Sequence, residues 1–293
     1  MIRYTSSPEE LSDAVDALDK RWRAKAETRT ARFINACKYD EESSQSIWST
    51  VKPAFMNLQK NKCVFCERQF ENELHGKIEF DLEHFRPKSS VEAWPIAGTH
   101  TLTYTFTTGA ASPSGYYWLA YDLTNYAASC KVCNSRLKSN YFPIEGARAT
   151  APGSLKTEKA FLCYPIGDED DDPEDILTFI GTVAVPRRKS GYKHRRGKII
   201  IDFFDLNRRE QLHRERAAHI ILLGNSLLNL DRGDGDPADE AIVARAKSAE
   251  APHAACMRSF FAQWQSDRPF ARKLLSSCKS YYASALGTLP QDQ

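Results

Sequence analysis

The chain has 293 residues, of which 42% are hydrophobic and 27% charged, with 14 glycines and 14 prolines. This composition is typical of a globular protein and excludes a disordered or fibrous chain, and the length suits one core domain with large extensions, or two domains. The formal net charge of +2 provides no field over the whole molecule that attracts nucleic acid, so any such attraction must be local.

The N-terminal sequence and the hydropathy pattern favour a cytoplasmic protein. The first ten residues, MIRYTSSPEE, contain no apolar core of a signal peptide. No apolar run reaches the ~18–20 residues that cross a bilayer. In this setting two CxxC pairs indicate metal ligands rather than disulfides. The other four cysteines are expected to be buried thiols: Cys37, Cys163, Cys256 and Cys278.

Residues 1–59 are predicted to form an N-terminal helical region. Ser7 to Glu10 form a capping box with proline at the first helical position. One apolar stripe is expected on the helix that follows, comprising Leu11, Val15, Leu18 and Trp22. A second helix is predicted from the same spacing of Trp48, Val51, Phe55 and Leu58.

Residues 60–143 have a different character, with short β-type stretches between loops. Strands are predicted at Ile78–Phe85, Thr101–Thr107 and Tyr116–Tyr121, and residues 89–115 are interpreted as an insertion. In the first strand apolar and acidic residues alternate, which predicts one buried and one acidic face. Pro87 ends this strand near His84.

Residues 144–197 are predicted to be a linker, and residues 198–293 a C-terminal helical region. This helical region is interrupted at 231–237, and its last helical part is predicted to run from Ala238 to about Leu286. The linker contains an acidic run from Asp168 to Asp175 and then a basic loop from Arg187 to Lys198. Under one interpretation the two runs form a solvated loop in which their charges partly neutralise each other. Under the other, the basic run is a contact surface for the DNA backbone. Under the second interpretation the candidates for phosphate contact are Arg187, Arg188, Arg195 and Arg196.

The two CxxC pairs predict a closed metal site. They consist of Cys63 and Cys66, then Cys130 and Cys133. Four thiolates make a tetrahedral zinc site with no open position for substrate, so this zinc is expected to be structural. The long segment between the pairs excludes a small zinc finger, and the metal is expected to join two parts of a larger unit.

Between the pairs, and directly after the second pair, lie the side chains of a metal-assisted cleavage site. Neutral His84 can take a proton from water, and the carboxylate of Glu83 is a hard ligand for Mg²⁺ or a similar cation. The carbonyl oxygen of Asn134 can be a second ligand, and Asn125 can hold His84 in orientation through the backbone. Taken singly, each asparagine is typical of a turn or a cap. Lys138, one turn after Asn134, is a candidate for phosphate contact.

The segments CVFC, DLEHFRPK and YDLTNYAASCKVCNSRLKSNYFP resemble the HNH endonuclease family in its four-cysteine form. The resemblance covers about residues 60–143. It implies an α+β fold with a ββα-metal (treble-clef) core, flanked by helices. It also implies His84 as general base, Asn125 as the orienting asparagine, Glu83 and Asn134 as ligands of a catalytic Mg²⁺ or Mn²⁺, and the four cysteines as structural zinc ligands.

Two positions depart from the family pattern. The last residue of the motif is Asn134 rather than histidine, and the first metal ligand is Glu83 rather than aspartate or histidine. Both can coordinate a hard cation, so the departures leave the preferred metal open. Asp81 could share or replace the role of Glu83.

In addition to the match over the core, the HFRPK segment and the CN…K…FP ending within it, and the later FFDLNRREQLHRER stretch, resemble the HNH subunits (PtuB) of Septu-type and retron-associated anti-phage systems. This resemblance implies an ABC/SMC-like ATPase partner (PtuA-like). The expected function is therefore metal-dependent cleavage of DNA, with Arg86 and Lys88 as further phosphate contacts. The alternative is a zinc-stabilised module that binds nucleic acid or protein without cutting.

Overall fold

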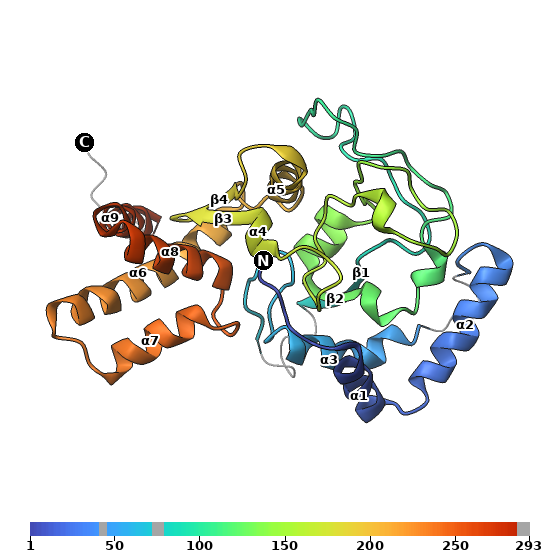
Figure 1. Cartoon of the computed structure of the whole chain (residues 1–293), viewed down its shortest axis with the longest axis horizontal. Coiled ribbons are helices and arrows are strands. Elements are labelled where there is room, and N and C mark those ends of the chain that lie inside the picture. The colour runs from blue at the N-terminus through green and yellow to red at the C-terminus, as the bar shows by residue number, and fades with distance from the viewer. Residues whose placement is uncertain (41–45, 72–78, 286–293) are drawn as a thin grey trace. The chain divides into compact units, whose positions relative to one another are not determined.

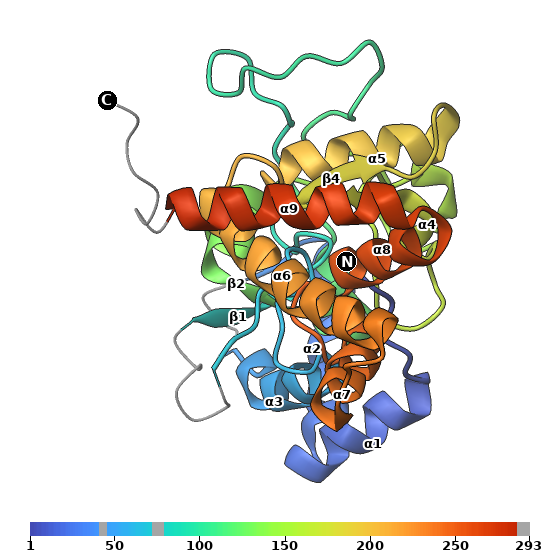
Figure 2. The same ribbon diagram turned by 90° about the vertical axis from the view of Figure 1, so that its left-hand side faces the viewer.

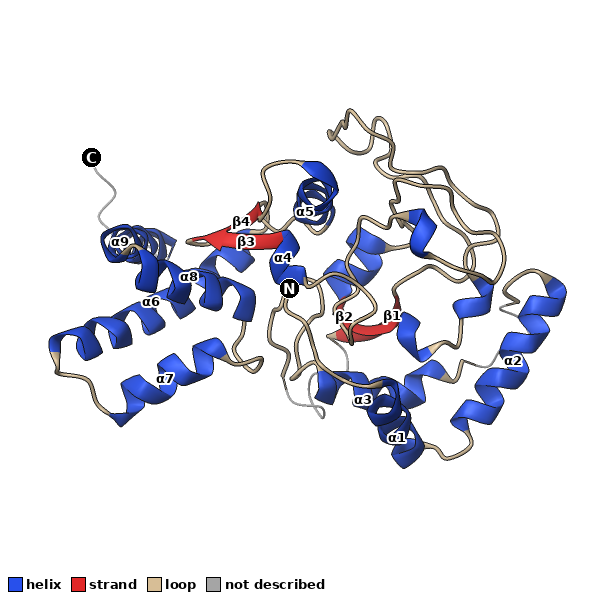
Figure 3. Ribbon diagram, in the orientation of Figure 1, coloured by secondary structure: helices blue, strands red, loops and turns tan. Residues whose placement is uncertain are grey.

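The computed structural model describes residues 1–40, 46–71 and 79–285 (Figure 1). Helices dominate, and the strands pair into two small antiparallel sheets (Figure 3). The chain divides into two compact units. The first unit comprises Arg3–Phe65 and Phe70–Asp171, and the second comprises the chain from Asp172 onward with Met1–Ile2 and Cys66–Gln69. Within the ranges described here, no helix is both long and apolar enough to cross a membrane.

The first unit contains three N-terminal helices and one two-stranded sheet. Its elements are α1 (Pro8–Leu18), α2 (Trp22–Ala36), α3 (Trp48–Leu58), β1 (Phe80–His84) and β2 (Tyr126–Cys130). The predicted start of α1 is confirmed, because the side chain of Ser7 accepts from the backbone of Glu10 and the Glu10 side chain accepts from Ser7. The predicted helix at α3 is also confirmed.

The single stripe predicted to run from Leu11 to Trp22 is wrong. Asp19 adopts an extended conformation and ends α1, so Trp22 begins a separate helix. Leu18 is consequently 43% exposed, whereas Trp22 is buried. The spacing of apolar residues alone predicted one helix where the structure has two. The hydrogen bond that ends α1 runs from the backbone N–H of Asp19 to the carbonyl of Val15, and a bond between backbone atoms leaves no signal in the sequence.

Of the three predicted strands, the structure has only the first among its described residues. It runs from Phe80 to His84, and Ile78 lies outside the described residues. Thr101–Thr107 is irregular, and Tyr116–Tyr121 contains a 3₁₀ turn. The aromatic residues of Tyr116–Tyr121 are buried, and those of Thr101–Thr107 are half-buried, in irregular structure. Aromatic content indicates a half-buried surface rather than a strand backbone. β2 pairs with β1 in the register Phe80↔Cys130 to His84↔Tyr126 and was not predicted.

The second unit is a helical assembly with a small hairpin. Its elements are α4 (Pro173–Ile176), β3 (Leu177–Ile180), β4 (Val183–Pro186), α5 (Gly191–Phe203), α6 (Glu210–Arg232), α7 (Pro237–Lys247), α8 (Ala254–Ser266) and α9 (Arg268–Ala285). The long helix α6 packs against α7 and α9 (Figure 2). At Gly224 a side chain would collide with Leu275 of α9, so glycine permits this close approach. The last helical part, predicted as one region from Ala238 to about Leu286, is divided between α7, α8 and α9, and Leu286 lies outside the described residues.

The basic loop predicted from Arg187 to Lys198 is wrong in its second half. Helix α5 begins at Gly191, so Arg195 and Arg196 lie on a helix. Arg196 is only 2% exposed, and its guanidinium lies 5.7 Å from the ring centroid of Tyr192. A run of charges is usually solvated, but here helix packing against the hairpin buries part of it.

Acid is expected to weaken the second unit through His219. Burial, and secondarily the neighbouring His253, lowers the pKa of His219 from 6.5 to about 4. Between these values the unfolded chain binds the proton and the folded chain does not. Stability is therefore lost as the pH falls from about 6.5 towards 4, by on the order of 2 kcal/mol.

Urea unfolding of the parent and of His219→Gln at pH 7 and pH 5 measures this effect. The loss between the two pH values should be smaller in His219→Gln. His194→Gln, on α5 of the same unit, is the matched control and should behave as the parent does. Equal losses in the parent and His219→Gln would contradict the assignment.

Candidate metal centre and active site

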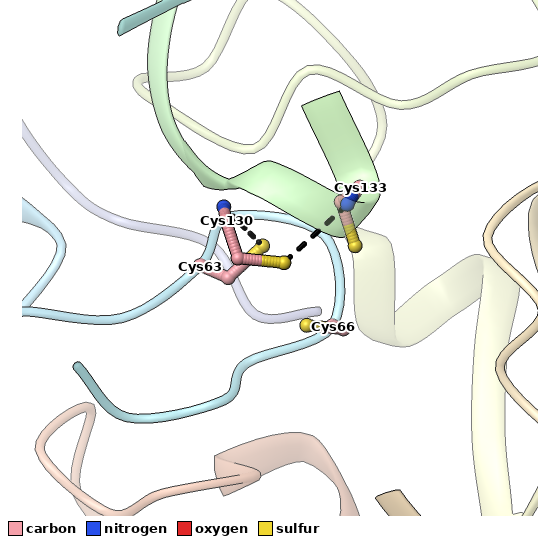
Figure 4. Close-up of side chains that lie close together, drawn as sticks. All are labelled: Cys63, Cys66, Cys130 and Cys133. Atoms are coloured by element: carbon pink, nitrogen blue, oxygen red, sulfur yellow. Dashed lines mark hydrogen bonds between the residues drawn. The ribbon is translucent and has the colours of Figure 1, made fainter. Parts of the chain in front are cut away.

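The four cysteines of the CxxC pairs form one buried cluster (Figure 4). Their Sγ atoms all lie within 4.8 Å of one another. A tetrahedral zinc with Zn–S bonds of about 2.3 Å needs sulfur separations of about 3.8 Å, so the cluster can hold a metal such as zinc. The backbone N–H of Cys130 donates to the Sγ of Cys63, and that of Cys133 donates to the Sγ of Cys130, each at 3.4 Å. Such bonds stabilise thiolates and orient metal ligands.

The remaining cysteines are only partly as predicted. Cys163, Cys256 and Cys278 are buried, but Cys37, which ends α2 in a left-handed conformation, is exposed. Burial raises the pKa of Cys256 to about 12 and that of Cys278 to about 11. These two thiols are therefore protonated and unreactive at neutral pH.

Strand β1 and the π-helix Val132–Lys138 bring the predicted active-site residues to one cavity. β1 carries Glu83 and His84, and the π-helix carries Asn134. The cavity measures about 350 Å³, and all three residues line it together with Asp81, Lys88 and Trp48. Because β2 pairs with β1 and leads through Cys130 to the π-helix, the sheet fixes the position of Asn134 relative to Glu83 and His84. π-Helical geometry is rare, and it occurs frequently at functional sites.

His84 is held as a neutral imidazole with a defined tautomer. Its Nε2 lies 3.0 Å from the carbonyl oxygen of Ala120. A carbonyl can only accept, so we assign the proton to Nε2 and the free lone pair to Nδ1. Burial, followed by the positive charge of Lys88, lowers the pKa of His84 well below its ordinary value. The rings of Trp48 and Tyr126 pack edge-on against the imidazole, each at 5.0 Å. This environment keeps the imidazole unprotonated, which is the form that a general base requires.

Asn125 clamps the backbone just after His84. Its Oδ1 accepts from the N–H of Arg86 at 2.7 Å, and its Nδ2 donates to the carbonyls of Arg86 at 3.0 Å and Leu119 at 3.1 Å. The carbonyl of Asn125 also accepts from the N–H of Phe85 at 2.8 Å. The predicted role of Asn125 in orienting His84 remains a prediction, and this geometry provides a physical route for it.

The predicted acidic face of β1 is not an exposed face. Glu83 is only 6% exposed, and its Oε1 lies 2.5 Å from the Nζ of Lys138. Burial raises the pKa of Glu83, and Lys138 partly offsets that shift. Asp81 is more exposed and contacts Lys131 at 3.1 Å, and it accepts from the Nδ2 of Asn134 at 3.3 Å. Asp81, Glu83 and Asn134 thus offer oxygen atoms that suit a hard cation.

The candidates for phosphate contact near His84 differ in accessibility. Lys88 lines the cavity, and its ammonium lies 4.9 Å from the ring of Trp48. Arg86 instead pairs with the buried carboxylate of Glu158 at 3.2 Å. Lys138 is fully buried. In this conformation Lys88 is therefore the candidate best placed for a phosphate.

The predicted phosphate contacts of the basic run belong to the second unit. Arg187 and Arg188 are exposed. Arg195 lies 6.0 Å from the ring of Tyr192, on the same helix as the buried Arg196. Of the four, Arg187 and Arg188 thus have the exposure that contact with a nucleic-acid backbone requires.

Sequence reasoning missed two residues that support the site. Trp48 was predicted only as one of the regularly spaced apolar residues of a helix, yet it packs on His84 and under Lys88. Glu158 lies in the predicted linker but is fully buried, and it binds the side chains of Arg86 and Tyr116. Neither position has a local sequence signal, because its partners are distant in the chain.

Comparison with known proteins supplies one informative relative. No protein-family model matches the chain. A stretch of 170 residues is 37% identical to the Septu protein PtuB of Bacillus mycoides strain KBAB4. The match covers 57% of this chain and 50% of that protein, so the chain spans about half the length of the relative that it matches. Over more than half of its own length, the chain is therefore similar to a protein of the Septu system.

Proposed function

We propose that the chain is a metal-dependent HNH-type endonuclease that hydrolyses DNA as the effector of a Septu-type anti-phage system. The observation that carries this proposal is the cavity in which neutral, buried His84 lies with Asp81, Glu83 and Asn134. We infer that β1, β2 and the π-helix form the ββα core of this family. The similarity to a Septu protein supports the defence role.

His84 is proposed to act as general base. Its Nδ1 takes a proton from water, whose oxygen then forms a bond to phosphorus while the bond to the 3′-oxygen breaks. The carbonyl of Ala120 accepts from Nε2–H and stabilises the imidazolium that forms. Lys88, which lines the cavity, attracts the phosphate.

The oxygen donors Asp81, Glu83 and Asn134 fit a hard divalent cation such as Mg²⁺ or Mn²⁺. When bound, such a cation stabilises negative charge on the phosphate and on the leaving oxygen. A separate zinc at the four cysteines is proposed to be structural, since four thiolates leave no open coordination position.

Nicking of supercoiled plasmid by the purified chain, with Mg²⁺ or Mn²⁺, tests the proposed reaction. Activity should require the added cation and stop with EDTA. A single-stranded RNA of matched length, assayed in parallel, tests the choice of substrate. A folded, zinc-containing protein that binds DNA but does not cut it under any cation condition would instead indicate a binding module.

We further expect the chain to co-purify with an ABC/SMC-like ATPase encoded by the neighbouring gene. Large apolar side chains are exposed in the second unit: Ile180 at 45%, Val183 at 42% and Leu222 at 51%. Stable interfaces bury about 1,200–2,000 Å² around such side chains. Co-expression followed by gel filtration should give a complex. Leu222→Asp should lower the affinity of the chain for this partner at least tenfold. A chain that elutes alone and cuts at full rate would contradict the partnership.

A further inference from the structure

Lys138 lies between the two functional groups of β1. It is the last residue of the π-helix that carries Asn134, and its side chain is fully buried. Nζ donates to the carbonyl oxygen of His84 at 2.9 Å and lies 2.5 Å from Oε1 of Glu83. To contact a phosphate in the cavity, this ammonium would have to abandon both partners and leave a carboxylate buried without a counter-charge, which is costly.

The ammonium affects the way Glu83 can bind a cation. One carboxylate oxygen of Glu83 already accepts from Lys138. A divalent cation on the other oxygen has to share the carboxylate with a fixed positive charge a few ångströms away. In a buried site of low dielectric, such like charges repel strongly. Lys131 makes an instructive contrast, because its contact with Asp81 is solvent-exposed and screened by water.

The same ammonium holds the backbone of the proposed base. The carbonyl of His84 and the carboxylate of Glu83 belong to adjacent residues, and one Nζ binds both. Resting on the proposed function, we propose that Lys138 is a positioning residue that joins the general base to the metal-binding carboxylate and keeps the affinity of the free site for divalent cations low. Negative charge brought by a substrate phosphate then offsets the repulsion.

Binding of Mn²⁺ to zinc-loaded protein without nucleic acid, followed by electron paramagnetic resonance, tests this role. Lys138→Met keeps the length and apolar stem of the side chain but removes the charge. Measured at a pH that keeps Glu83 ionised in both proteins, it should bind Mn²⁺ about tenfold more tightly, or better, than the parent. Lys131→Met removes an equal charge from an exposed pair and should change the affinity by less than about twofold.

Nicking kinetics separate positioning from a general loss of structure. Lys138→Met should reach half-maximal rate at a lower Mn²⁺ concentration, yet its rate at saturating Mn²⁺ should fall at least about tenfold. Lys138→Gln retains an N–H donor for the carbonyl of His84 and should recover part of that rate while still binding Mn²⁺ more tightly than the parent. If Lys138→Met fails to fold, Lys138→Gln provides the binding measurement.

The outcomes distinguish this inference from the proposed function. The role of Lys138 is overturned if the Lys138 variants bind Mn²⁺ no more tightly than the parent. It is also overturned if they bind Mn²⁺ more tightly but adding Glu83→Gln to the same variant leaves that tighter binding unchanged. Absence of Mn²⁺ binding in both parent and variants overturns it as well. The proposed function is judged separately, by whether the parent nicks plasmid with an added cation.

Discussion

We expect His84→Ala to lower the rate of plasmid nicking by about 10²–10⁴-fold, while the protein keeps its zinc. The imidazole is neutral, and its Nε2 proton is fixed by the carbonyl of Ala120, so the variant removes the proton acceptor Nδ1. The four cysteines that can hold zinc come from other segments of the chain. Single-turnover rates at saturating Mn²⁺, together with zinc content, measure the effect.

Two further variants control for packing. His84 contacts the rings of Trp48 and Tyr126, so alanine also leaves a cavity that costs some stability. His84→Gln retains more of the volume and should be nearly as inactive but more stable to heat. His100→Ala removes a histidine of the same unit that accepts from the backbone of Ile96 and should nick at the parental rate. Parental activity in His84→Ala would remove the assignment of the base.

The second large effect is expected at the cysteine cluster. Cys63→Ser or Cys130→Ser should give protein that lacks zinc and is unfolded or aggregated. Binding of structural zinc contributes roughly 10–16 kcal/mol in small zinc-binding peptides, which matches or exceeds the ~5–15 kcal/mol that stabilises a whole domain. Cys130 ends β2 beside β1, so its loss also disturbs the position of the π-helix.

Elemental analysis and circular dichroism check this expectation. Cys37→Ser is the matched control, because Cys37 is exposed, and it should retain zinc and fold. About one zinc per chain is expected in the parent. Well-folded, active protein without zinc would be incompatible with a structural metal.

The sequence by itself was sufficient to predict features that depend on a few neighbouring residues. The spacing within each CxxC pair is a local property, and it correctly predicted that four cysteines gather in one site. The capping box at Ser7 predicted the start of α1, and the alternation after residue 79 predicted β1. Glu83, His84 and Asn134, which the sequence predicted as a general base and metal ligands, line one cavity, and their catalytic roles remain predictions.

Only the tertiary structure decided which of these groups are exposed and which partners they have. Lys138 reaches a carbonyl 54 positions earlier, and Arg86 pairs with a carboxylate 72 positions later. The ion pair between Lys138 and Glu83 is buried, so neither side chain is exposed to solvent. Neither contact leaves a trace in local periodicity, because strand pairing and helix packing bring these segments together. The sequence therefore determined the chemical groups of the proposed site, whereas long-range packing determined their charge environment.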